Sequence, residues 1–366
     1  MTVRHSIKQY QRNIRIIPFL LFTLFLFACG KAAPPPRLEF VLGTVCSVNL
    51  FEFGNEKLYS DIFVRVWEID RTMNATGGLF GNQLSTLILI NQNAGIAPVQ
   101  IGDDLLDVLQ KAKYYAELSK GAFDPTIGPL VSLWGIGTDA ERVPEAYEIE
   151  QALSLVDWRD LILDREQGTA FLRQQGMKLD LGAIAKGYAA DEVIRIAKEA
   201  KAVHGIIDMG GNIVALGGRD KNRRAASAPW RIGIQDPLGQ RGTYIGVLLA
   251  ADKSVVTSGV YERYFEIDGK TYHHILSTED GYPVDNGLLS VTIIADQSID
   301  ADGLSTSVFA LGFQKGLDLL KTIPNTEAIF IFDDCSVFIT DNLKKVFSIT
   351  NNKYKLSEAG QFHFND

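Results

Sequence analysis

The stretch KLDLGAIAKGYAAD, which begins at Lys178, limits the folds open to this chain more than any other. Its alternating apolar residues predict a short strand that ends at Asp180, and Gly182 predicts a turn into a helix that continues to about residue 202. A helix N-terminus after a glycine turn presents backbone amides to anions. Lys186 lies in the first helical turn, where the helix dipole favours acids, so a phosphate site is indicated. The alternative is that the two glycines permit close packing and Lys186 is solvated.

The remaining patterns are typical of an α+β fold with mixed, mainly antiparallel sheets packed with several helices. Apolar residues at helical spacing occupy Glu56–Ala75, Asp103–Leu118, Glu145–Val156 and Asp302–Lys321. Strand patterns occupy Leu38–Phe53 (one broken strand or a hairpin), Leu161–Asp164, Ala170–Leu172, Met177–Leu179 and most of 205–295 and 328–340. We expect one domain, or two closely packed lobes, over residues 37–350, and a loose polar tail over 351–366.

The N-terminal 36 residues have the pattern of a bacterial export signal followed by a tether. Four basic residues and no acid occupy positions 1–15, and the apolar run that follows ends at residue 28. At about 13 residues this run is shorter than the ~20 that span a membrane. The run ends in LFACG, which resembles a lipobox. We therefore expect a signal peptide over 1–28, lipidation of Cys29, and a proline-rich tether over 29–36. The alternative is a short uncleaved anchor.

Composition excludes some classes of protein. The net charge of −8 argues against binding to nucleic acid, which favours a basic face. An anionic ligand would instead need a local device such as a metal, a helix N-terminus or a lysine. Three cysteines are too few for a disulfide scaffold, and the sequence leaves open whether Cys46 and Cys335 are free or paired.

Asp302 and Thr306 are the candidate metal ligands. They are four residues apart in a predicted helix, so both lie on one face. A carboxylate and a hydroxyl are oxygen ligands, which suit Mg²⁺ or Ca²⁺ rather than zinc. The alternative is that Asp302 caps the helix and Thr306 is a surface hydroxyl.

Eight motifs together resemble the ApbE family, the FAD:protein FMN transferases. In chain order they are FDPTIGPL from Phe123, WGIG from Trp134, DLGAIAKGY from Asp180, MGGN from Met209, TSGVYER from Thr257, HHI from His273, SVTI from Ser290 and ADGLST from Ala301. The resemblance covers about residues 37–347. It implies a Mg²⁺-dependent transfer of FMN from FAD to a threonine hydroxyl of an acceptor flavoprotein, with release of AMP.

The resemblance also implies roles for single residues. Metal ligation is implied for the backbone carbonyl of Ala183 and the side chains of Asp302 and Thr306, and contact with FAD for Leu42, Thr76, Ala122, Phe123, Asp124, Asp180, Lys186, His274 and Ile275. Lys186 would steady the phosphates, and either Asp180 or His274 could act as the base. The implied partners are FAD and acceptor subunits of membrane redox complexes. The implied location is the outer (periplasmic) face of the bacterial cytoplasmic membrane.

The chain departs from the family pattern in two places that bear on FAD. Where the family usually has Asp/Asn-Pro-Arg/Lys-Thr-Gly after the paired histidines, residues 277–281 are STEDG, and Thr76 stands where an aromatic residue often stacks on the flavin. Two alternatives therefore accompany the transferase: a Mg²⁺-dependent FAD pyrophosphatase that gives FMN and AMP, and a non-catalytic FAD-binding lipoprotein.

Overall fold

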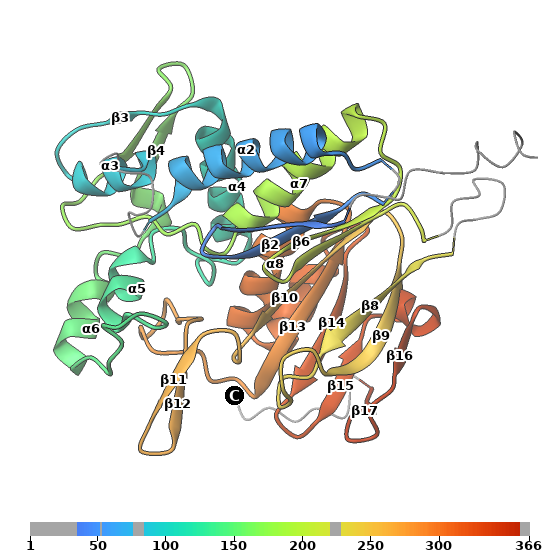
Figure 1. The fold of residues 1–366 in the computed structure, drawn as a ribbon. Coiled ribbons are helices and arrows are strands. Elements are labelled where there is room, and N and C mark those ends of the chain that lie inside the picture. Colours follow the sequence, from blue (N-terminus) through green and yellow to red (C-terminus); the bar gives the residue numbers. More distant parts are fainter. Residues whose placement is uncertain (1–34, 52, 76–83, 220–227, 359–366) are drawn as a thin grey trace, which may run out of the picture.

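The structure, a computed structural model, describes residues 35–51, 53–75, 84–219 and 228–358. In this part of the chain, nine strands form one large sheet in the order β1-β2-β6-β7-β10-β13-β14-β15-β17 (Figure 1). All neighbouring strands are antiparallel except β15 and β17. The strands are β1 (Arg37–Val41), β2 (Thr44–Asn49), β6 (Gly205–Met209), β7 (Asn212–Leu216), β10 (Lys253–Gly259), β13 (Leu288–Ala295), β14 (Glu327–Phe332), β15 (Ser336–Ile339) and β17 (Lys355–Leu356).

Smaller sheets and the helices complete the fold. The smaller sheets comprise β3 (Val99–Gln100), β5 (Thr169–Leu172) and β4 (Leu161–Asp164); β16 (Phe347–Ile349), β9 (Tyr244–Ala250) and β8 (Trp230–Gln235); and β11 (Tyr264–Ile267) with β12 (Lys270–His273). The helices are α2 (Glu56–Met73), α3 (Thr86–Gln92), α4 (Asp103–Leu118), α5 (Gly128–Trp134), α6 (Ala146–Leu153), α7 (Ala185–Glu199), α8 (Ser298–Leu311), α9 (Phe313–Leu320) and the short 3₁₀ turns η1 (Trp158–Asp160) and η2 (Asp341–Lys345).

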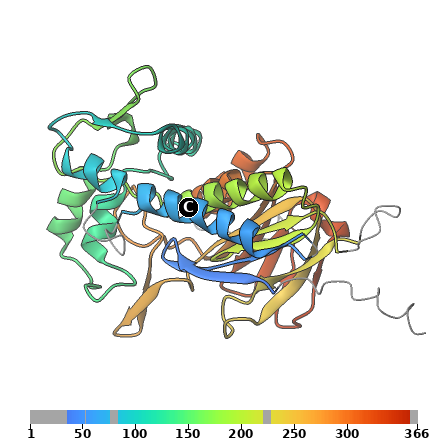
Figure 2. The same cartoon turned by 45° about the horizontal axis from the view of Figure 1, so that its top comes forward.

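The central strands of the large sheet are buried on both faces. Alternate residues of its central strands point to opposite sides, so Val256 and Ile293 pack with the helices while Val255 and Ile294 pack with the β8–β9–β16 sheet. At the other end of the sheet, β1, β2, β6 and β7 pack against α2 and α7. Figures 1 and 2 show these helices along one face of the sheet and β8, β9 and β16 beyond the opposite face. This architecture confirms the predicted α+β class.

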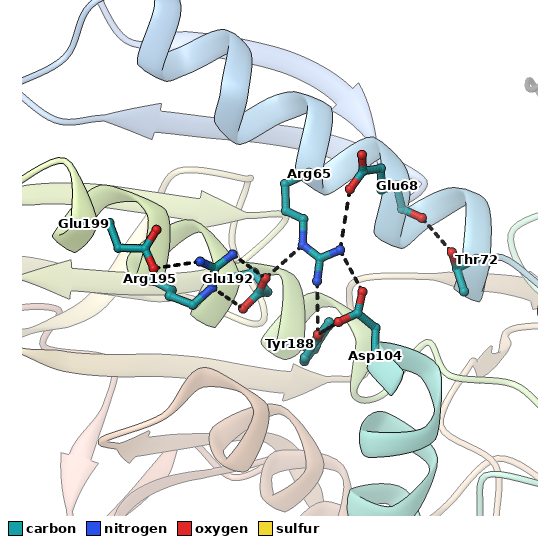
Figure 3. A network of polar contacts seen from close by, with 8 residues as sticks. All are labelled: Arg65, Glu68, Thr72, Asp104, Tyr188, Glu192, Arg195 and Glu199. Carbon is teal, nitrogen blue, oxygen red and sulfur yellow. Dashed lines mark hydrogen bonds and ion pairs between the residues drawn. The ribbon is translucent and has the colours of Figure 1, made fainter. Parts of the chain in front are cut away.

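Helix α7 is tied to its neighbours by Arg65 of α2 (Figure 3). The Arg65 guanidinium lies 2.8 Å from Glu192 of α7 and 2.7 Å from Asp104 at the start of α4. Tyr188 of α7 donates its hydroxyl proton to the same Asp104 at 2.6 Å. Three helices that are distant in sequence are therefore held at one partly buried cation.

The predicted strand before Asp180 is absent. Lys178 makes only an isolated bridge to Ile127, and the third strand beside β4 and β5 is β3 rather than 177–179. The Asn91 side chain accepts a hydrogen bond from the Leu179 amide at 2.7 Å and donates one to the Leu179 carbonyl at 3.1 Å. Because Asn91 satisfies both backbone groups, Leu179 needs no strand partner.

The predicted helix over Asp302–Lys321 is two helices, and the first begins earlier. Helix α8 starts at Ser298, so Asp302 lies in its second turn and is not a cap. Gly312, with a φ of +76°, separates α8 from α9 because this backbone conformation ends a right-handed helix. Helix α4 begins at Asp103, as its apolar pattern predicted, and its N-cap is Gly102.

Other segments match or extend the patterns. The residues around Leu42 and Gly43 form a hairpin turn between β1 and β2, and Asp268-Gly269 joins β11 to β12. The expected loose tail is attached further than predicted, because β17 pairs with β15 and Tyr354 is buried. Cys46 and Cys335 are free thiols. In the described residues, no helix has the length and hydrophobicity needed to cross a membrane.

Candidate functional site

At the N-terminus of α7, the predicted site residues Asp180 and Lys186 both bind the backbone of Gly182. The Asp180 carboxylate accepts a hydrogen bond from the Gly182 amide at 2.8 Å, which fixes the turn into the helix. Lys186, in the first turn of α7, donates to the Gly182 carbonyl at 2.8 Å and lies 4.0 Å from Oδ1 of Asp302. The lysine is therefore not simply solvated: its ammonium lies between the turn and the Asp302 carboxylate.

The backbone amides at the start of α7 were expected to bind an anion, and one of them binds Asp302 instead. The Gly187 amide donates to Asp302 Oδ2 at 2.9 Å, and the Asp302 side chain is only 5% exposed. A Cβ atom on Gly187 would lie 2.4 Å from the Ser298 carbonyl oxygen, so this glycine does permit close packing of the two helices. The prediction of close packing is thus confirmed at Gly187, and Oδ1 is the carboxylate oxygen that faces Lys186.

Hydroxyl groups surround the second half of the predicted metal pair. Thr306 Oγ1 lies 3.2 Å from Ser258 Oγ, at the end of β10, and Ser258 Oγ lies 2.8 Å from Ser305 Oγ. Ser305 donates to the Asp302 carbonyl at 2.9 Å. Strand β10 thus supports the helix turn that carries Asp302 and Thr306. Sequence reasoning did not assign a role to Ser258 or Ser305, although both lie inside quoted motifs.

Phe123 and Asp124 of the loop Ala122–Asp124 are buried, and the acid accepts hydrogen bonds from Thr126 and Trp158. Asp124 is 8% exposed, and its carboxylate accepts hydrogen bonds from the amide and hydroxyl of Thr126, both at 2.7 Å, and from the Trp158 amide at 2.9 Å. Burial nevertheless raises the pKa of Asp124. Phe123 is buried and packs edge-to-face on Tyr115, while Ala122 is partly exposed. In this structure Asp124 shapes the loop, and Ala122 is the more accessible of these three residues.

The two adjacent histidines, at the end of β12, contact different carbonyl groups. His273 is buried, and its Nε2 lies 2.9 Å from the Val284 carbonyl. His274 is partly buried, and its Nδ1 lies 3.2 Å from the Arg263 carbonyl. A carbonyl only accepts, so Nδ1 carries the proton and Nε2 of His274 keeps its lone pair. Loss of hydration, together with the Arg263 charge, lowers the pKa of His274 to about 3, and the Lys186 charge acts in the same direction. Ile275, which follows, is buried in the core.

The unusual 277–281 loop is held against the Ala122 loop and α5. Thr278 donates its hydroxyl proton to the Gly121 carbonyl at 2.8 Å, and Trp134 donates its indole proton to the Gly281 carbonyl at 2.8 Å. The Ser277 hydroxyl accepts from the amides of Glu279 and Asp280. Residues 277–281 thus form an ordered turn that carries two exposed acids and contacts the backbone directly before Ala122.

The turn at Leu42 is fixed by a buried acid. Leu42 has a φ of +57°, and its amide donates to Asp70 of α2, whose pKa is raised by burial. Asn74 donates to the same carboxylate at 3.1 Å. This acid was not predicted as part of the site. Thr76 and Cys29 lie outside the described residues, so the roles expected of them stay predictions.

The donor set fits an oxygen-coordinated ion in its chemistry. Asp302 contributes one carboxylate, Thr306 one hydroxyl and the partly exposed Ala183 one carbonyl. In the described residues no three His, Cys, Asp or Glu side chains gather at a possible metal position. Such a site would therefore rely on water and substrate oxygens for its other ligands, which is the habit of Mg²⁺ rather than zinc.

Comparison with known proteins identifies the family. The profile of the ApbE family matches residues 42–330. The chain belongs to the ApbE family. It is 38% identical over 310 residues to a FAD:protein FMN transferase of Treponema pallidum (strain Nichols), a match that covers 81% of this chain and 84% of the relative. It is 39% identical over 275 residues to a FAD:protein FMN transferase of Klebsiella pneumoniae (strain 342), which covers 75% and 84%.

Solved ApbE structures share the fold. The ApbE protein of Thermotoga maritima superimposes with a TM-score of 0.75 at 30% identity, over 85% of this chain and 98% of that one. The flavin transferase ApbE of Vibrio cholerae superimposes with a TM-score of 0.74 at 25% identity, over 85% and 98%. These matches confirm the family resemblance and the fold class, and the relatives' shared name is that of a transferase, as predicted.

Proposed function

We propose that this chain transfers FMN from FAD to a threonine hydroxyl of an acceptor flavoprotein and releases AMP. The threonine oxygen attacks the FMN phosphorus, a new P–O bond forms, and the bond from that phosphorus to the bridging oxygen breaks. The bridging oxygen leaves with AMP, and the threonine proton passes to a base. The observation that carries this proposal is the meeting of Lys186 and Asp302 at the α7–α8 contact, with Thr306 one helical turn further along α8, in an ApbE fold.

The residues have distinct tasks in this reaction. Asp302, Thr306 and the Ala183 carbonyl would hold Mg²⁺, which polarises a pyrophosphate oxygen and offsets the charge that develops on it. Lys186 lies 4.0 Å from the Asp302 carboxylate. It would therefore contact the pyrophosphate that the metal contacts, as a second positive charge. Asp180 or the Nε2 atom of His274 accepts the threonine proton.

A mixing experiment tests the reaction. The mature chain, FAD, Mg²⁺ and a threonine-containing acceptor domain are incubated with and without EDTA, and the acceptor mass and the nucleotides are measured together. FMN-modified acceptor together with AMP, both lost with EDTA, is the expected result. Free FMN and AMP with an unmodified acceptor would indicate a pyrophosphatase, and bound, intact FAD would indicate a binding protein. The experiment includes these last two outcomes because residues 277–281 form an ordered loop with two acids.

We further propose that the chain is lipid-anchored through Cys29 on the periplasmic face of the cytoplasmic membrane, near acceptor subunits of membrane redox complexes. The support is the basic and apolar leader followed by LFACG. Expression of the wild type and Cys29→Ser with labelled palmitate tests it. Label and membrane association should both be lost in the variant, and an equally labelled variant would contradict the assignment.

A further inference from the structure

Asp191 of α7 satisfies the N-terminus of α8 with both of its carboxylate oxygens. Oδ1 accepts from the Ser298 amide at 2.8 Å, and Oδ2 accepts from the Ile299 amide at 2.9 Å. The residue at the N-cap of α8, Gln297, makes no side-chain capping bond of its own. The first two amides of α8, which have no partner inside their own helix, are therefore held by a neighbouring helix.

A second contact runs in the opposite direction between the same helices. The Gly187 amide of α7 donates to Asp302 Oδ2 of α8 at 2.9 Å. Gly187 and Asp191 are one helical turn apart, and so are Ser298 and Asp302, so the two contacts lie side by side. Each helix thus contributes one carboxylate that accepts hydrogen bonds from backbone amides of the other helix.

The contact leaves little room for the helices to shift. A Cβ atom on Gly187 would lie 2.7 Å from the Ile299 Cα and 2.8 Å from the Asp302 Cβ. The adjacent side of α7 is fixed by the Arg65 network, through Glu192 and Tyr188 (Figure 3). The position of Asp302 therefore depends on how α8 is fastened to α7.

We propose that Asp191 is a positioning residue for Asp302: by fastening the start of α8 to α7, it sets where the Asp302 carboxylate stands relative to Lys186. This inference rests on the metal site of the proposed function. Groups that orient a metal ligand without touching the metal typically change metal affinity by 10–100-fold when they are removed. We expect an effect at the lower end, because the Gly187–Asp302 bond remains.

The charges around Asp191 determine the pH at which the test is made. Asp300 of α8 is an acid whose charge acts on Asp191, and it is paired with Lys111 and Tyr115 of α4. Burial, with a contribution from Asp300, raises the pKa of Asp191 to about 6. Binding is therefore measured at pH 8, where Asp191 is ionised and accepts from both amides.

The experiment compares Asp191→Asn with Asp300→Asn in the mature chain. Asparagine keeps one acceptor oxygen but presents an NH₂ group to the second amide, so one capping bond is lost. Asp300→Asn removes an acid from the same turn of α8 without touching α7. Mn²⁺ alone is titrated into each protein by electron paramagnetic resonance, and FMN transfer is measured separately.

We expect Asp191→Asn to weaken Mn²⁺ binding about tenfold and to lower kcat with little change in KM for FAD. Asp300→Asn should leave Mn²⁺ binding unchanged. A lower melting temperature in Asp191→Asn with wild-type Mn²⁺ affinity would overturn the proposal, because Asp191 would then be merely structural. If Asp191→Asn does not fold, Asp191→Glu provides the same comparison, since it keeps the charge but its longer side chain displaces the start of α8.

Asp302→Ala separates the two proposals. If it binds Mn²⁺ as the wild type does, the metal site of the proposed function is wrong. If it loses Mn²⁺ while Asp191→Asn retains it, only the positioning role is wrong.

Discussion

The backbone amide of Gly187 donates a 2.9 Å hydrogen bond to Oδ2 of Asp302, across 115 positions of sequence. This bond joins the two motifs that the sequence marks most strongly, DLGAIAKGY and ADGLST. It leaves Oδ1 directed towards Lys186. Gly187 therefore serves the site in two ways: its amide binds Asp302, and its lack of a side chain lets α8 approach α7.

Gly187→Ala should destabilise the protein by about 1–3 kcal/mol, the usual cost of forcing a methyl group into a packed contact. The new Cβ would meet the Ser298 carbonyl at 2.4 Å, so α7 and α8 must separate. Urea unfolding would measure the loss. Gly102→Ala is the control, because its Cβ would meet nothing within 4 Å. Only the poorer N-cap preference of alanine then acts, with an expected loss of about 0.5–1 kcal/mol. Equal stability of the two variants would contradict the tight contact.

Asp302→Asn should reduce Mg²⁺-dependent FMN transfer by at least about 100-fold, because a neutral amide replaces the only carboxylate of the proposed ligand set. The Gly187 bond can persist through the amide oxygen, so the fold should be retained. Activity is measured against Mg²⁺ concentration, with circular dichroism as the check on folding. Wild-type turnover at the same Mg²⁺ concentration would exclude Asp302 as a metal ligand.

Asp180→Asn and His274→Gln should separate the two candidate bases. Removal of the base should slow transfer to threonine by about 10²–10⁴-fold, while removal of the other group should affect mainly FAD binding. Single-turnover measurements at saturating FAD would distinguish a loss of chemistry from a loss of binding. If neither variant slows the chemical step, both assignments are wrong.

His274 should make the fold less stable as the pH falls. Its pKa in the folded protein is lowered to about 3, against an ordinary value of 6.5, because burial disfavours the charged ring. Between these values the unfolded chain takes up a proton and the folded chain does not, so stability is present above pH 6.5 and is lost towards pH 3. The urea midpoint should therefore fall less between pH 7 and pH 5 in His274→Gln than in the wild type. An identical fall in both proteins would show that His274 does not contribute.

Arg65→Met should cost about 1–3 kcal/mol in stability, since it leaves Asp104 and Glu192 without their shared cation. Arg195→Met is the matched control, because Arg195 is a half-exposed cation that pairs with Glu192 and Glu199 of its own helix, and its loss should cost less than about 1 kcal/mol. Thermal unfolding of both variants measures the difference. FMN transfer per folded molecule should be unchanged in both, and a similar loss of stability in the two would contradict the bracing role of Arg65.

The sequence by itself determined the local structure and the chemical residue types. Periodic apolar residues located α2, α4, α7 and most strands, because burial of one face imposes a period of 3.6 or 2. It also marked Asp302 and Thr306, an acid and a hydroxyl four residues apart in one helix, and Lys186, a cation in the first turn of another helix. It failed at residues 178–180, where the distant Asn91 replaces a strand partner.

Only the tertiary structure decided how these residues meet. Asp191 lies inside a quoted motif, yet its pairing with the start of α8 depends on a helix contact that spans more than 100 residues of sequence. The same holds for the Gly187–Asp302 bond and for the Asp124 carboxylate, which accepts a hydrogen bond from the distant Trp158 amide. A sequence pattern records the faces and spacing of one element, whereas the partner of a buried polar group is set by how separate elements pack.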